Sequence, residues 1–485
     1  MSELDSLVGQ VRLAAIDAYM RSEDYLADGD QYRHLYSATV PGAVTRPGAD
    51  GLGGGIVLAI PQQHPRAGVS DEVIAQLKAQ FAERLEAQWF AIRRRIDQAI
   101  EPWLGTPEAS AFDGVSRGCD LLIGRLMGVV AQSGNAFSGS GELGIDLHRL
   151  TIESTTFGGG ALDDFKTRYI DASSTRAARI TALVEVLGEA SNAEREVWKR
   201  SRVDLVELLE GYRRGFEKVA AGDSANMAIV LSVVGAAVAG AAIFASAGTA
   251  TGIALAGAGI IVSLAKSIDS EVGGEPKDTR EFDDVESGLA AFELAIGALS
   301  DRVYAEETGI CRGVEVNIEG VRSNAAMFQL EPAPIYRWDD ATMYAEPQKN
   351  FSVARTFMPN VASAVGAAAG KPGEIAAAFR QAIHHDYAAG RRSSGAHAEV
   401  QSLASLISAL LRELEWDLDR GARNLELALQ DLVDLERDHE QALGELAAQI
   451  DSGVTHDGRA AEDLLAPPPP PPYPGGGSRI RQIME

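Results

Sequence analysis

The chain is poor in cysteine and in basic residues. Only two cysteines, Cys119 and Cys311, stand among 485 residues, too few for a disulfide framework; they form either one bridge or two buried free thiols. The 44 lysines and arginines are outnumbered by 69 acidic residues, and the formal net charge is −25. A surface this acidic repels phosphate groups. We therefore expect no nucleic-acid partner and no spontaneous binding to anionic lipid.

Signatures of catalysis are also missing. The sequence contains no Walker loop, dinucleotide-binding glycine motif, H-E-x-x-H or nucleophile elbow. His384, His385 and Asp386 are consecutive, but neighbours on a helix point about 100° apart and converge poorly on one ion. We therefore expect no enzymatic activity, no cofactor, no metal site and no small-molecule substrate.

The N-terminus lacks the apolar core of a secretory signal peptide. It begins MSELDSLVGQVRLAAIDAY, with acidic residues where such a peptide carries basic ones. We expect secretion without a cleaved signal peptide or, alternatively, a cytoplasmic location.

Charge is completely absent from residues 224–265, although 23% of the whole chain is charged. A helix of about 20 apolar residues spans a bilayer. A longer neutral run with a soft centre at 246–252 predicts two apolar helices, 227–246 and 253–264, folded into a hairpin. Insertion of either arm is favourable by only about 2 to 5 kcal/mol, so it would be conditional. Two interpretations stay open, a membrane-inserting hairpin and the buried core of a helical bundle.

Apolar and glycine positions define the candidate hairpin. They are Val230, Val234, Gly235, Gly240, Phe244, Gly248, Gly252, Gly257 and Ile261. Gly248 and Gly252 form a G-x-x-x-G motif, which lets helices approach closely in lipid.

Helical periodicity dominates the remaining sequence. We predict an all-α fold, an elongated bundle of long helices with a central apolar hairpin and a C-terminal coiled-coil-like helix. The regions are 1–165 (helical), 166–330 (long helices around the hairpin), 331–395 (irregular and short-helical), 396–452 (a heptad helix) and 453–485 (a disordered Pro/Gly-rich tail). Glycine-rich stretches at 38–68 and 133–165 predict loops, with residues 56–60 as a strand or buried segment.

The C-terminal helix has the clearest repeat. Its seam positions alternate three and four residues apart and are Leu425, Leu429, Leu432, Glu436, His439, Leu443, Leu446 and Ile450. Such a seam predicts self-association or a helical partner protein, and its polar members, Glu436 and His439, set register more readily than they bind ligands.

Two predicted helices, 70–100 and 107–132, meet at Trp103-Leu104-Gly105. In such a turn tryptophan packs across both helices and glycine permits the reversal. A W-x-G turn between antiparallel helices resembles the WXG proteins and related substrates of type VII (ESX) secretion. Substrates of that route also carry a tyrosine followed four residues later by an acid, as Tyr19 and Glu23 do here. The resemblance implies export by a type VII system.

The layout of residues 174–305, a long helix, an apolar segment and a second long helix, resembles the cytolysin A-type α-helical pore-forming toxins. That resemblance implies a hairpin that inserts into a target membrane after binding, with the long helices lining an oligomeric pore. We therefore expect a secreted bacterial helical protein that permeabilises membranes, with lipid as a conditional partner. The alternative is a non-enzymatic helical scaffold whose apolar hairpin is buried core.

Overall fold

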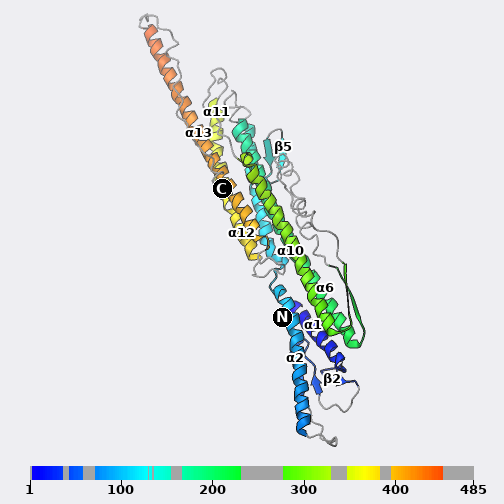
Figure 1. Ribbon diagram of the computed structural model, residues 1–485. Helices are drawn as coiled ribbons and strands as arrows, with labels where there is room; N and C mark the ends of the chain where they lie inside the picture. The colour runs from blue at the N-terminus through cyan, green and yellow to red at the C-terminus, as the bar shows by residue number, and fades with distance from the viewer. Residues whose placement is uncertain are drawn as a thin grey trace.

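The computed structural model describes residues 3–35, 43–57, 71–128, 130–133, 136–153, 166–230, 277–328, 347–382 and 395–451. These residues form an elongated, mainly helical bundle (Figure 1). The α-helices are α1 (Glu3–Ser22), α2 (Asp71–Leu104), α3 (Asp113–Arg125), α4 (Glu142–Glu153), α6 (Ala172–Ala221), α10 (Val285–Ser323), α11 (Pro347–Ala369), α12 (Lys371–Ala382) and α13 (His397–Asp451). Shorter turns are η1 (Ala109–Phe112), η3 (Lys166–Asp171) and η4 (Ala325–Phe328). The predicted all-α bundle is confirmed for this part of the chain.

Helix α6 is the axis of the bundle. Nearly every side chain from Ser173 to Glu194 is buried, because α1, α3, α10 and α13 pack around it. The buried side includes charged groups. Arg176 is 1% exposed and pairs with Asp417 of α13 at 2.5 Å, while the Oε1 atom of Glu194 accepts a hydrogen bond from the backbone N–H of Ala396 at 3.0 Å.

Three small antiparallel sheets accompany the helices. The first sheet has the strand order β1 (Tyr25–Asp28), β2 (Gln31–His34), β3 (Ala43–Thr45), β4 (Gly55–Val57). The second sheet pairs β5 (Val130–Ser133) with β6 (Ala136–Gly139). The third sheet pairs β7 (Ala225–Val230) with β8 (Lys277–Phe282). The first sheet lies against α2, where the rings of Tyr32 and Trp89 are 6.1 Å apart.

Several predicted boundaries are wrong. The predicted loop at 38–68 contains β3, while β4 overlaps the start of the predicted strand or buried segment at 56–60. The predicted helix at 107–132 ends at Arg125 and is followed by β5. The predicted loop at 133–165 contains β6 and α4. Strands of three to six residues are too short for their alternation to be separated from loop sequence.

The long helices agree better with their periodicity. Helix α6 covers the predicted 174–221, and α13 covers the predicted 396–452 almost completely. Helix α10 continues to Ser323 through Gly309 and Gly313, beyond residue 305, where the predicted second long helix ends. Gly313 is buried in α10, where close helix packing offsets the low helix propensity of glycine. Cys119 and Cys311 are both buried, and no disulfide joins them.

Candidate functional site

The two strands on either side of residues 231–276 pair with each other in one antiparallel ribbon. Strand β7 follows α6, strand β8 precedes α10, and the two pair antiparallel from Ala225 opposite Phe282 to Val230 opposite Lys277. Strand β7 packs against α6 and β8 against α10, so the ribbon lies beside the two long helices (Figure 1). Both ends of the intervening segment are therefore held next to each other.

This ribbon corrects the prediction for the start of the hairpin. Residues 227–230, expected to begin an apolar helix, belong to strand β7, and Val230 is its last residue. The backbone of this stretch pairs with residues about fifty positions later, a partner that local periodicity does not reveal. The other hairpin residues lie outside the described residues: Val234, Gly235, Gly240, Phe244, Gly248, Gly252, Gly257 and Ile261.

A left-handed glycine turns the chain from α6 into β7. Gly222 has φ of 96° and donates its N–H to the carbonyl of Val219 at 2.9 Å, while Asp223 donates to Lys218 at 3.0 Å. This is a helix end in which glycine avoids the Cβ clash of other residues. The turn carries the chain back beside α6.

An aromatic cluster anchors the ribbon to the helices, and we call Tyr212, Phe216, Phe282 and Phe292 the foot cluster. Tyr212 of α6 stacks on Phe282 of β8 with ring centres 5.9 Å apart, and meets Phe292 of α10 edge-on at 5.2 Å. Phe216 lies 5.3 Å from Phe282. All four side chains are at most 3% exposed. The foot cluster therefore joins α6 and α10 to β8.

A glycine makes the foot cluster possible. A Cβ atom on Gly288 of α10 would lie 2.5 Å from Phe216 Cε1 and 2.9 Å from Phe282 Cδ2. Only a residue without a side chain lets α10 approach these rings. Helical periodicity places Tyr212 and Phe216 on the buried side of their helix, whereas no sequence pattern points to Gly288, Phe282 or Phe292.

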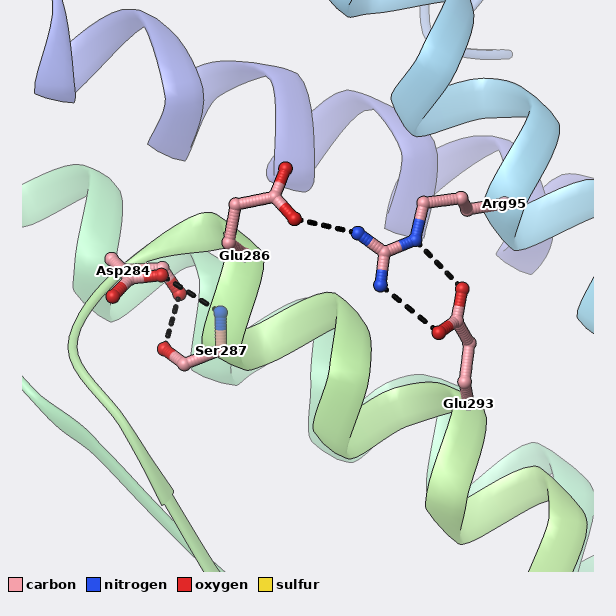
Figure 2. A network of polar contacts seen from close by, with 5 residues as sticks. All are labelled: Arg95, Asp284, Glu286, Ser287 and Glu293. Carbon is pink, nitrogen blue, oxygen red and sulfur yellow. Dashed lines mark hydrogen bonds and ion pairs between the residues drawn. The ribbon is translucent and has the colours of Figure 1, made fainter.

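Polar contacts hold the start of α10, next to the foot cluster, against α2. Helix α10 begins with a capped turn, where the Asp284 carboxylate accepts the N–H of Ser287 at 2.8 Å. Arg95 of α2 donates to both carboxylate oxygens of Glu293, at 2.7 and 2.9 Å, and to Glu286 at 2.7 Å (Figure 2). The hydrogen bonds to Glu293 raise the pKa of Arg95 above its usual value. Arg95 thus ties α2 to the first turns of α10.

The predicted W-x-G hairpin is not formed. Helix α2 continues through Pro102 to Leu104, and it packs on α1 and α10, whereas α3 packs on α6 and α12. Trp103 is 1% exposed and Gly105 is exposed in the turn that follows. Trp103 is therefore a core side chain at the end of α2, and the two helices do not fold back on each other.

The candidate secretion signal is held in the fold. Tyr19 is on α1, Glu23 follows its end, and the tyrosine hydroxyl donates to the Glu23 carboxylate at 3.1 Å. Arg84 of α2 donates to the other carboxylate oxygen at 2.6 Å. Burial, followed by the charge of Glu23, raises the pKa of Tyr19 to about 12. These contacts give both residues a structural role between α1 and α2.

Of the two polar residues of the C-terminal seam, the structure describes the side chain of His439. His439 is exposed on α13, as are Leu443 and Leu446. His384, His385 and Asp386 lie outside the described residues. Among the described residues, no three His, Cys, Asp or Glu side chains are grouped to hold a metal ion, and no helix is long and apolar enough to cross a bilayer.

Comparisons with protein families, with curated proteins and with solved structures found no match to this chain.

Proposed function

We propose that this protein inserts residues 231–265 into a lipid membrane when the β7–β8 ribbon separates from α6 and α10. One observation carries the proposal. An uncharged run begins in one strand of an antiparallel pair, and the chain returns through the other strand. Paired strands lie about 5 Å apart, so a segment that crossed into lipid would enter and leave on the same side. That connection suits a hairpin inserted from one face of a membrane.

The composition of the run supports lipid as its second environment. Ordinary core helices are amphipathic, with charged residues on the outer face, as in α13. Residues 231–265 have no charged position on any face. Each apolar arm of this segment holds six Ile, Val, Leu or Phe residues, so its insertion is favourable by about 2 to 4 kcal/mol. That free energy is comparable with what the packing of one phenylalanine such as Phe282 contributes, about 3–5 kcal/mol.

The contacts around the foot cluster are strong enough to hold the ribbon in place until lipid or a partner is present. An aromatic pair contributes about 0.5–1.5 kcal/mol beyond the area that it buries, and a partly exposed ion pair such as Arg95 with Glu293 contributes at most about 1 kcal/mol. Burial of Phe282 adds about 3–5 kcal/mol, so release of the ribbon requires lipid or a partner to offset that free energy. Export by a type VII system stays a prediction that rests on the spacing of Tyr19 and Glu23, since α2 and α3 do not form the expected W-x-G hairpin.

The test is release of a dye from neutral phosphatidylcholine vesicles by the purified full chain. We expect leakage after mild acidification or heating, and its loss in a Val234→Asp/Ile261→Asp variant. The matched control adds the same two charges at exposed positions, Leu121→Asp/Leu294→Asp (69% and 59% exposed), and should leak like the native chain. Circular dichroism verifies that all three keep their helix content. Equal leakage from both variants, or none from the native protein, rules the proposal out.

The competing function is a helical scaffold in which residues 231–265 are core. The exposed seam of α13 favours an interaction role, because Leu443 and Leu446 are 65% and 52% exposed. Limited proteolysis with and without vesicles distinguishes the two. A scaffold keeps one cleavage pattern, whereas an inserting segment gains protection only when lipid is present.

A further inference from the structure

The leucine seam of α13 changes its surroundings along the helix. In the first half, Leu403, Ile407, Leu410, Leu414, Leu418 and Leu425 are at most 2% exposed, because α6, α10, α11 and α12 pack on α13. In the second half, every side chain from residue 437 to 448 is exposed. Figure 1 shows the last turns of α13 extending beyond the other helices. The same apolar repeat therefore continues into a part of the helix that protrudes.

The seam of residues 429–446 is complementary in sequence to its own reversed copy. In two antiparallel helices, each first seam position of a heptad faces a second seam position of the other helix. About a centre between Arg437 and Asp438, Leu429 faces Leu446, Leu432 faces Leu443, and Glu436 faces His439. Every leucine then meets a leucine, and the two polar seam residues meet each other. A carboxylate accepts a hydrogen bond from an imidazole N–H, so the polar layers satisfy themselves.

We propose that the end of α13 binds a second copy of this chain, as an antiparallel helix pair over residues 429–446. The proposal goes beyond membrane insertion and does not depend on it. Leu425 is buried within its own chain, and we therefore end the pairing at Leu429. The overlap is about 27 Å long at 1.5 Å per residue.

The charges flanking the seam favour this orientation. Residues 426–451 contain eight acids and one arginine, so a self-pair succeeds only where acids avoid each other. In the antiparallel register the residue that follows each second seam position faces the equivalent residue of the other helix. Glu440 then faces Val433, and Glu426 faces Ala447. The other acids, Asp431, Asp434, Asp438 and Glu445, occupy outer positions away from the seam. A parallel pair would place Glu436 against Glu436 of the second copy, which is unfavourable at a seam position.

The helix is already formed before it pairs. Isolated helices of such a length are marginal in water because nucleation is unfavourable. Here the segment continues a 55-residue helix whose first half is fixed in the bundle. Repulsion between two chains of charge −25 is screened beyond about 8 Å at physiological salt, so we expect tighter pairing as salt rises.

Sedimentation equilibrium of the full chain over a concentration series tests the pair. The native chain should dimerise, and Leu443→Asp/Leu446→Asp should be monomeric. In each polar layer of the dimer, His439→Glu places a glutamate opposite Glu436 of the other copy. This variant should raise the dissociation constant more than about tenfold. The exchange Glu436→His/His439→Glu should restore the native value. Leu427→Asp is the control, since Leu427 is exposed but off the seam, and should dimerise normally.

Disulfide trapping tests the orientation. A mixture of Leu432→Cys and Leu443→Cys chains should form the mixed disulfide, since facing seam positions are within disulfide reach, and each variant alone should not. The native Cys119 and Cys311 are buried and give no background. A monomer at the highest soluble concentration, seam variants that dimerise like the native chain, or self-crosslinking of Leu443→Cys would each overturn the proposal. So would a monomer that binds a synthetic basic amphipathic helix through this seam.

Discussion

Tyr212 of α6 and Phe282 of β8 stack with ring planes only 11° from parallel and centres 5.9 Å apart. The two residues are seventy positions apart in the chain, and their contact fixes the end of the ribbon to the longest buried helix. Phe282 stands at the last paired position of β8, opposite Ala225. The ribbon's attachment therefore depends on this one ring more than on any other side chain that the structure describes in β8.

Replacing Phe282 with alanine should loosen the ribbon. Removing a fully packed phenylalanine costs about 3–5 kcal/mol, and here the loss falls on contacts with Tyr212 and Phe216. Hydrogen exchange of the β7 and β8 amides should accelerate, and dye release should begin under milder conditions. Phe282→Leu is the control and should show a smaller effect in both measurements. If exchange accelerates but leakage does not, attachment of the ribbon does not control insertion.

Gly288→Ala should disturb the same cluster by overpacking. The added methyl would meet Phe216 and Phe282 at less than 3 Å, and such insertions cost about 1–3 kcal/mol. Gly297 is on the same helix, is exposed, and has nothing within 4 Å of a built Cβ. Gly297→Ala should therefore stabilise the protein by up to about 1 kcal/mol. Urea denaturation of both variants checks the opposite signs.

Arg95→Gln should remove the link between α2 and α10. The arginine side chain is 26% exposed and Glu293 41%, so we expect a loss of at most about 1 kcal/mol. The loss should shrink at high salt, since screening already weakens the native ion pair. Thermal unfolding at low and high ionic strength measures it. A loss that is independent of salt would mean that Arg95 acts through packing.

Arg176→Met should be far more costly. Arg176 is 1% exposed, and its removal leaves the Asp417 carboxylate, 14% exposed, without its guanidinium partner. Burial already raises the pKa of Asp417. Breaking one side of a buried pair typically costs about 3–5 kcal/mol. The double variant Arg176→Met/Asp417→Leu should recover much of that stability in denaturant titrations, because neither charge of the pair is then left without its partner. A double variant no better than the single one would contradict this reasoning.

Alkaline pH should weaken the contact between α1 and α2. The pKa of Tyr19 is raised to about 12 in the fold, above the unfolded value near 10. Between these values the unfolded chain has lost a proton that the folded chain keeps, so stability falls as pH rises from about 10 to 12. Tyr19→Phe cannot ionise and should show a flatter pH dependence in urea titrations over this window.

The long helices were predictable because their cause is local. The leucines of α13 recur three and four residues apart, and this spacing alone places them on one face of a helix. The buried side of α6 followed from the same rule. Short strands were not predictable. Residues 227–230 have the apolar character of either structure, and β8 supplies their hydrogen-bonding partner from the other side of the uncharged run.

The candidate site was partly visible in the sequence. The absence of charge between 224 and 265 needed only counting. Its attachment was not visible, since Arg95, Phe282 and Phe292 are unremarkable in their own segments and acquire a role only when α2, β8 and α10 meet. Trp103 and Gly105 show the reverse case, where a local motif suggested a hairpin that the packing of α2 and α3 on different helices excludes.

The amino-acid sequence by itself determined the helical class, the acidic surface, the neutral run and the self-complementary seam of α13, because each depends on composition or on spacing along one segment. The tertiary structure decided which elements pair. The β7–β8 ribbon, the foot cluster and the Arg95 contacts all join residues distant in the chain, and the free energy that selects them comes from burial and hydrogen bonds that exist only once those segments are packed together.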